Sequence, residues 1–147
     1  MGLWVLHLIS AGSVLAMERI EWECEVCNQP IEEGDGSLWV DIDEADRVAT
    51  AKEHWRREHT SGEGTLCTVD DPLDAPAEAR WHQTHHACRP KDEIRGYEVD
   101  VGRIRTPWLL LTWTSHLLGK LWVYENSNWL GLVKDVAHAH GADVSTS

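Results

Sequence analysis

Two pairs of metal-ligand residues limit what this chain can fold into more than any other feature of its sequence. Cys24 and Cys27 form a C-x2-C pair, and His85 and Cys88 form an H-x2-C pair. Thiolates two residues apart on a tight turn point the same way, and Zn²⁺ prefers four sulfur or imidazole ligands in a tetrahedron. A fold that satisfies both pairs must bring them together, although the 57 residues at positions 28–84 separate them.

We therefore predict that one Zn²⁺ ion is bound by Cys24, Cys27, His85 and Cys88. Protein then fills all four positions and none is left for water, so the site is expected to be structural rather than catalytic. Other residues that could replace one member of this set are Cys67, His86 and His59. Cys67 is the main rival, but its apolar surroundings are more typical of a small residue buried in a short strand.

The charge of the chain disfavours general nucleic-acid binding. Its 147 residues, enough for one domain with a core, carry a net charge of −12, from 25 acidic and 13 basic residues. The basic residues nearest to a cluster are the pair Arg56-Arg57 and the scattered arginines and lysine of residues 89–105, which leave a local basic face at 89–105 as an alternative. An acidic surface, with runs at 41–46 and 63–78, suits solubility or a basic protein partner.

The N-terminal segment 1–17 is apolar and contains no Lys, Arg, Asp or Glu. It is too short to span a membrane as a helix, and it lacks the positive charge that begins a signal peptide. We expect a leader that lies upstream of a true start at Met17; a short packed segment and an export signal are the alternatives. Four cysteines without a secretory framework indicate a reducing, cytoplasmic location. Residues 18–141 are predicted to form a single zinc-binding domain, followed by a flexible tail at 142–147.

Periodicity predicts a mixed fold. Alternating polar and apolar residues predict strands at 18–23 and 97–104, and an enrichment in strand-forming residues predicts one at 37–42. Asp43 can cap a helix over 43–59, and residues 60–79 are rich in turn formers. The expected fold class is α+β: a small zinc-stabilised, treble-clef-like β-hairpin core with an inserted helix and two C-terminal helices.

The first C-terminal helix is expected to begin with Thr106 as its cap and Pro107 in its first turn. Its apolar residues form two rows: Leu110, Trp113, Leu117 and Leu121, and Leu111, Leu118 and Trp122. A helix that is apolar on two sides is expected to be largely covered. A last helix, capped by Asn126 or Ser127, is expected to end near Gly141.

The knuckle at 24–27, the glycine-rich hairpin after it and the H-x2-C turn resemble treble-clef and LIM-like zinc modules. The separation of the two pairs is far longer than in a LIM domain, so the helix at 43–59 and the loop at 60–79 would be insertions. The chain also resembles a group of small uncharacterised proteins of actinobacteria and their phages over about residues 20–137. The stretches that carry this likeness are Cys-Glu-Val-Cys-Asn-Gln-Pro-Ile, Gly-Asp-Gly-Ser-Leu-Trp-Val, Trp-His-Gln-Thr-His-His-Ala-Cys and Trp-Thr-Ser-His-Leu-Leu-Gly-Lys. The resemblance implies the same zinc-site fold and lends no activity.

The expected function is a non-catalytic, zinc-stapled module that binds a protein partner, and the resemblance suggests a phage or mobile-element accessory protein. Nine Trp, two Tyr and no Phe suit a core or a protein interface. The alternative is an HNH-like metal-dependent nuclease or a nucleic-acid-binding zinc finger, with His85-His86 standing in for the base region. The nuclease interpretation lacks a second C-x2-C and an Asn shortly after the histidine pair. A redox role for Cys24 and Cys27 would need a thioredoxin-like strand–helix context, but a turn follows Cys27. The H-E-x-x-H pattern of zinc hydrolases is also missing.

Overall fold

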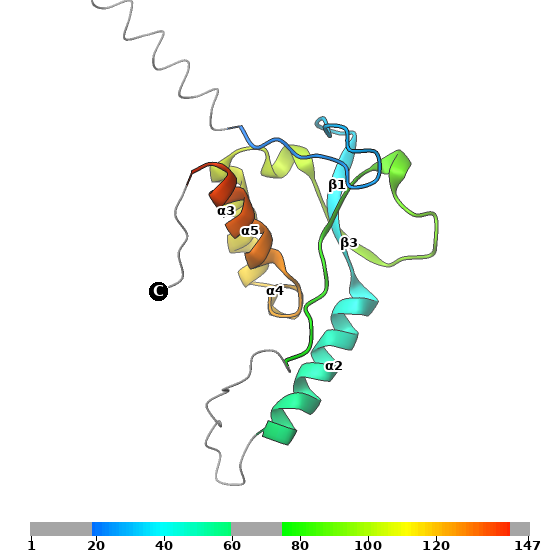
Figure 1. Ribbon diagram of the computed structural model, residues 1–147, viewed down its shortest axis with the longest axis vertical. Coiled ribbons are helices and arrows are strands. Elements are labelled where there is room, and N and C mark those ends of the chain that lie inside the picture. The colour runs from blue at the N-terminus through cyan, green and yellow to red at the C-terminus, as the bar shows by residue number, and fades with distance from the viewer. Residues whose placement is uncertain (1–18, 60–74, 142–147) are drawn as a thin grey trace, which may run out of the picture. The chain divides into compact units, whose positions relative to one another are not determined.

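The computed structural model describes residues 19–59 and 75–141 (Figure 1). Predictions for residues 1–18, 60–74 and 142–147, Cys67 among them, lie outside the described residues. The first half of the fold is formed by β1 (Gly36–Asp41), α2 (Ile42–His59), β2 (His82–His85) and the 3₁₀ helix η2 (His86–Cys88). The second half is formed by β3 (Gly96–Asp100), the 3₁₀ helix η3 (Val101–Ile104), α3 (Pro107–Leu118), α4 (Leu121–Tyr124) and α5 (Trp129–Ala139).

The three strands form one antiparallel sheet in the order β2-β1-β3. The central strand β1 is buried from Gly36 to Val40, which explains its almost continuous run of apolar or small residues. Its C-terminal end passes directly into α2 (Figure 1). The α+β class and the helix inserted between the ligand pairs are therefore confirmed.

The described residues divide into two compact units. The first unit contains residues 19–38, 83–89 and 99–116, and the second contains 39–59, 75–82, 90–98 and 117–141. The boundary falls inside each strand of the sheet, so each strand contributes residues to both units.

The first unit has a small core next to its N-terminal segment. Ile20, Trp22, Ile31 and Ile104 are buried there. The indole N–H of Trp22 donates to the carbonyl oxygen of Ile104 at 3.1 Å, and the amide of Ile31 donates to the carbonyl of Trp22 at 2.8 Å. The predicted strand over 18–23 is reduced to one isolated bridge between Glu23 and Pro30, because the chain turns within the next few residues.

The second unit is held together by large aromatic side chains. Trp81 contacts Trp129 edge-on, with ring centroids 4.9 Å apart, and its indole N–H donates to the hydroxyl of Ser127 at 2.8 Å. Tyr97 meets Trp81 and Trp122 in further edge-to-face contacts. Trp81 and Trp129 are almost fully buried, so these pairs form a true core.

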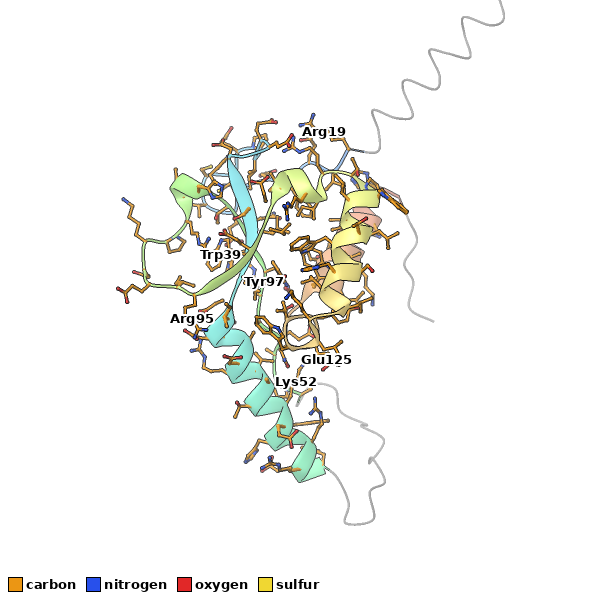
Figure 2. All side chains as sticks on the ribbon, turned by 180° about the vertical axis from the view of Figure 1, so that it is seen from behind. Arg19, Trp39, Lys52, Arg95, Tyr97 and Glu125 are labelled. Atoms are coloured by element: carbon orange, nitrogen blue, oxygen red, sulfur yellow. The ribbon has the colours of Figure 1, made fainter. Side chains whose placement is uncertain are left out.

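Helix α2 joins this unit through a small buried face and a basic side chain. Ala45 and Val48 are buried on it. The ammonium of Lys52 donates to the carbonyl oxygen of Glu125 and lies 3.8 Å from a carboxylate oxygen of Glu78. Figure 2 shows Lys52 reaching from α2 towards Glu125.

The strand predicted over 97–104 is correct only in its first half. β3 ends at Asp100, and residues 101–104 form the 3₁₀ helix η3. The Asp100 carboxylate accepts a hydrogen bond from the amide of Gly102 at 2.8 Å and so caps η3. Val99 and Val101 are both buried, as their alternation in the sequence predicts. The strand nevertheless ends at Asp100, because the side chain of this residue caps the 3₁₀ helix that follows.

The start of α3 is as predicted, but its expected burial is wrong. Pro107 is its first residue, and the Thr106 hydroxyl accepts from the amide of Leu109 at 3.2 Å. Trp108 is 73% exposed and Leu111 is 58% exposed, because the helix packs through only one of its apolar rows. The helix also stops at Leu118, and α4 is a separate helix, so three C-terminal helices replace the two expected.

The last helix is close to its predicted position. α5 begins at Trp129, with Asn128 in the cap position, rather than one or two residues earlier. Across 19–59 and 75–141, no helix is both long enough and apolar enough to cross a bilayer.

Candidate metal centre

The first ligand pair lies on a tight knuckle. The amide of Cys24 donates to the carbonyl of Gln29 at 2.9 Å, and the amide of Asn28 donates to the carbonyl of Cys24 at 2.8 Å. Asn28 has a φ of 58°, in the left-handed region that asparagine tolerates better than most residues. This turn reverses the chain within six residues and presents the side chains of Cys24 and Cys27 together.

The second ligand pair lies where β2 ends. His85 is the last residue of the strand, and Cys88 is the last residue of η2. The amide of Arg89 donates to the carbonyl of His85 at 3.1 Å, which closes a single helical turn. The H-x2-C spacing therefore places both side chains on one side of that turn, as the sequence predicts.

A glycine allows the second pair to approach the first. Gly36 faces the backbone of β2, and a Cβ there would lie 2.4 Å from the carbonyl oxygen of Thr84 and 2.6 Å from a methyl carbon of Ile31. It would also lie 3.0 Å from the Cα of His85. Any larger residue at position 36 would have to displace the backbone that carries His85.

The four predicted ligands converge within the first unit. One ligand atom from each of Cys24, Cys27, His85 and Cys88 lies within 4.8 Å of the others. The Nδ1 of His85 is 3.3 Å from the sulfur of Cys27 and 3.9 Å from that of Cys88. Tetrahedral Zn²⁺ with ordinary bond lengths has ligand–ligand edges of about 3.5–3.8 Å, so small side-chain shifts would close the tetrahedron.

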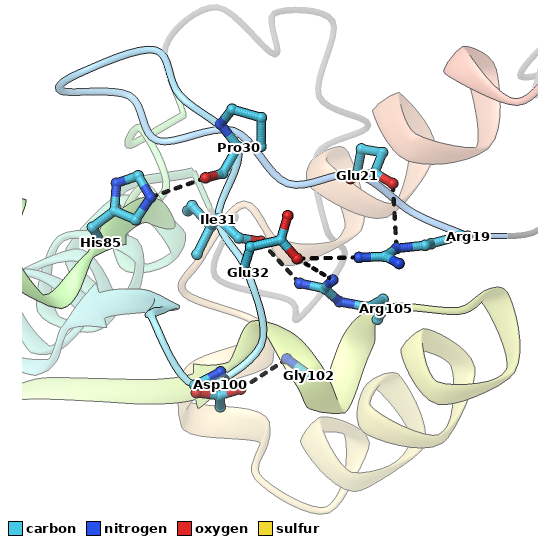
Figure 3. Close-up of polar contacts among 10 residues, drawn as sticks. Arg19, Glu21, Pro30, Ile31, Glu32, His85, Asp100, Gly102 and Arg105 are labelled. Atoms are coloured by element: carbon cyan, nitrogen blue, oxygen red, sulfur yellow. Dashed lines mark hydrogen bonds and ion pairs between the residues drawn. The ribbon is translucent and has the colours of Figure 1, made fainter.

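The ring of His85 is oriented by a backbone carbonyl. Its Nε2 lies 3.0 Å from the carbonyl oxygen of Pro30. Figure 3 draws this contact between His85 and Pro30. A carbonyl accepts only, so Nε2 carries the proton and Nδ1 presents its lone pair to the three sulfurs. Metal-binding histidines usually donate their other ring N–H to a carbonyl or carboxylate in this way.

The local electrostatics favour a thiolate at the centre of the cluster. Burial alone would raise the pKa of Cys24, but hydrogen bonds from the backbone amides of Cys27, His85 and Val26, with one from the Cys27 side chain, lower it to about 6. Burial and the neighbouring sulfurs of Cys24 and Cys27 raise the pKa of Cys88 to about 11. The amide hydrogen bonds of the knuckle therefore favour the thiolate form of Cys24, which is the form that binds a metal.

The pKa of His85 is also shifted by its surroundings. Its hydrogen bond to the carbonyl of Pro30 is the largest influence and raises its pKa; burial opposes this, and the nearby Cys24 and Asp35 add to the increase. A bound cation would reverse this preference, because the ligands must be deprotonated thiolates and neutral imidazole. The donor set of three sulfurs and one imidazole nitrogen fits Zn²⁺.

The two alternative ligands that the structure describes, His86 and His59, are not part of the cluster. His86 is exposed, and its backbone amide donates to the carbonyl of Asp35 at 3.0 Å. His59 lies at the end of α2, where its ring stacks on Trp55 with centroids 4.3 Å apart. Within 19–59 and 75–141, the four predicted residues form the single group of three or more potential ligands at metal-binding distances.

Two supporting features were not predicted from the sequence. The carbonyl of Pro30 and the absent side chain of Gly36 position His85, yet neither residue has a ligand side chain. The glycine-rich turn at 34–36 could have pointed to the role of Gly36. Nothing in the sequence pattern indicated which neighbouring segment Gly36 would face.

Comparisons with known proteins add no family to this picture: no family model, curated protein or solved structure matches the chain. The resemblances to treble-clef modules and to proteins of actinobacteria and their phages therefore stay predictions. The metal-binding geometry rests on the cluster itself.

Proposed function

We propose that this chain is a non-catalytic module that is stapled by one structural Zn²⁺ ion and binds a protein partner. The observation that carries the proposal is the convergence of Cys24, Cys27, His85 and Cys88, with the His85 ring held by the Pro30 carbonyl. Protein atoms occupy all four tetrahedral positions in this proposal. A closed coordination sphere leaves no place for a reacting water, which is typical of structural zinc.

The role of the ion follows from the short elements around it. The knuckle, the end of β2 and η2 are brief segments with few internal hydrogen bonds, and isolated pieces of this length are not stable in water. Zinc binding to such sites contributes about 10 kcal/mol or more of apparent free energy near neutral pH. The metal would therefore replace the larger hydrophobic core that this part of the chain lacks.

The partner is proposed from an exposed apolar flank of α3, defined by Trp108 and Leu111. Trp108 is 73% exposed and Leu111 is 58% exposed on adjacent turns of one helix. Tryptophan is enriched at the energetic centres of protein interfaces. Residues 101–123 contain no Asp or Glu, so we expect the flank to bind its partner mainly through apolar contacts.

A nuclease function has weaker support. His85 would have to serve as a base or metal ligand of an open site, but its Nδ1 faces three sulfurs and its Nε2 is engaged by Pro30. The proposal also includes a treble-clef-like arrangement around the metal and a role as an accessory protein of a phage or mobile element.

The first test measures metal content. Purified protein should contain one zinc per chain by elemental analysis, and removal of zinc with a chelator should unfold residues 19–38 and 83–89. Cys88→Ser should lose the metal, whereas Cys67→Ser should keep it. A folded, metal-free native protein would contradict the proposal.

The second test separates a binding module from a nuclease. A partner that binds through the α3 flank should be lost with Trp108→Ser and retained with Leu130→Ser. Leu130 is a matched control because it is also exposed, at 47%, but lies on α5. Cleavage of DNA with Mg²⁺ or Mn²⁺ that His86→Ala abolishes would support the nuclease instead.

A further inference from the structure

A groove in the first unit lies between η3 and one side of α3. It has a volume of about 400 Å³ and is lined by Gly102, Arg103, Leu109, Thr112, Trp113 and His116. We call it the α3 groove. The four α3 residues are spaced by three or four positions, so they form one continuous face of the helix, and this face differs from the flank of Trp108 and Leu111.

The α3 groove contains hydrogen-bond donors. The indole nitrogen of Trp113 is buried and has no hydrogen-bond partner among the described residues. Arg103 adds further N–H groups at the groove, and none of its described lining residues is Asp or Glu. A buried N–H without an acceptor costs about 1–3 kcal/mol, so an occupant that supplies a carbonyl oxygen would recover that cost.

The first described residues of the chain are anchored immediately before α3. The amide of Ile20 donates to the carbonyl oxygen of Arg105 at 2.7 Å. Glu32 accepts from both Arg19 and Arg105, at 3.3 and 3.2 Å, and Figure 3 shows this junction. Arg105 lies two residues before Pro107, which begins α3. The segment that precedes Arg19 therefore leaves the described structure next to the start of this helix.

We propose that the apolar segment 1–17 of the same chain docks in the α3 groove. Its side chains include leucine, isoleucine, valine and tryptophan and no Lys, Arg, Asp or Glu, so docking would bury no charged side chain of the segment itself. Its backbone carbonyls would supply the acceptor that the indole N–H of Trp113 lacks. Segment 1–17 would then be a short packed segment of the first unit, and this proposal does not depend on the metal.

Length and attachment both permit this contact. The groove residues of α3 span about 10 Å along the helix, at 1.5 Å per residue, and an extended segment covers about 3.3 Å per residue. A short tether gives the segment an effective concentration on the order of millimolar. Even a contact too weak to hold a separate peptide would then be substantially occupied.

The experiment uses the full-length protein and follows hydrogen exchange of residues 109–116 together with the indole N–H resonance of Trp113. The double variant Leu6→Glu and Ile9→Glu should shift that resonance and speed exchange by about tenfold, because charged residues cannot enter the groove. The control, Ser10→Glu with Ser13→Glu, adds the same charge at polar positions of the segment and should change neither signal.

A second pair of variants tests the groove side. Leu109→Glu, in the groove, should expose segment 1–17 to proteolysis near Trp4, whereas Leu111→Glu, on the other flank of the same helix, should not. Both leucines are exposed, so neither change threatens folding. Unchanged exchange in the Leu6→Glu and Ile9→Glu variant would overturn the proposal. Protection that instead rises with protein concentration would also overturn it and assign the groove to a second copy of the chain.

Discussion

The two units of this protein hold themselves together by different chemistry. The first unit contains the cluster of three sulfurs and one imidazole, next to a core in which Trp22 is the one buried aromatic side chain among the unit's described residues. The second contains edge-to-face contacts among Trp81, Tyr97, Trp122 and Trp129 and has no comparable group of ligands among its described residues. Short turns can therefore be stabilised by a few strong bonds to a metal, whereas helices and strands are stabilised by the burial of apolar surface.

The largest effect is expected from removal of the proposed metal. Cys24 is fully buried at the centre of the cluster, so Cys24→Ser should abolish zinc binding and remove about 10 kcal/mol of apparent binding free energy. Hydrogen exchange should accelerate first in residues 19–38 and 83–89. Equal acceleration around Trp81 and Trp129 would mean that the two units do not differ in what holds them.

The second prediction concerns the aromatic core of the second unit. Trp129 is 0% exposed, so Trp129→Ala should lower the free energy of unfolding by about 3–5 kcal/mol in urea titrations. Trp108→Ala, at an exposed position, should change it by less than about 0.5 kcal/mol. The folded fraction of Trp129→Ala should still contain one zinc per chain, and loss of the metal from that fraction would count against separate stabilisation.

The third prediction concerns packing around the ligands. Gly36→Ala would place a Cβ 2.4 Å from the carbonyl oxygen of Thr84, so it should cost about 1–3 kcal/mol and weaken zinc binding by moving His85. Gly131→Ala is the matched control, because nothing lies within 4 Å of its added Cβ in α5. That change should stabilise the protein by about 0.5–1 kcal/mol. Equal effects at the two glycines would rule out crowding at position 36.

The fourth prediction is a smaller change in the aromatic unit. Ser127→Ala removes the acceptor of the Trp81 indole N–H and should cost about 1 kcal/mol in thermal or urea unfolding. Ser115→Ala, at an exposed position of α3, should be close to neutral. A neutral Ser127→Ala would show that the ring contacts of Trp81 are sufficient without its hydrogen bond.

The smallest effect is a dependence on alkaline pH. Burial raises the pKa of Tyr97 above its usual value of 10.0, which means that the folded state holds the phenol proton more tightly than the unfolded state. Stability from this group is complete below pH 10 and falls as the pH rises from the unfolded pKa through the folded one. Tyr97→Phe should therefore lose less stability than the wild type between pH 9 and pH 11 in urea titrations. An identical loss in both proteins would show that Tyr97 ionises equally in both states.

Much of the secondary structure could be predicted because it depends on neighbouring residues. Asp41 illustrates the limit: the helix was expected to be capped by Asp43, but the Asp41 carboxylate accepts from the amides of Asp43 and Glu44, and α2 begins at Ile42. The Thr106–Pro107 start of α3 was predicted correctly because cap and first turn are adjacent in sequence. The exposed apolar row of α3 was not, since periodicity identifies apolar faces and cannot say how many of them have a neighbour.

The sequence by itself determined which four residues could form a metal site, because C-x2-C and H-x2-C each place two ligands on one turn. Only the tertiary structure decided that the two turns meet, that Gly36 makes room for them and that the Pro30 carbonyl selects Nδ1 of His85 as the free nitrogen. The reason is one of range. Ligand spacing acts over three or four residues, whereas these contacts join segments about 50 residues or more apart, and no local pattern encodes their distance.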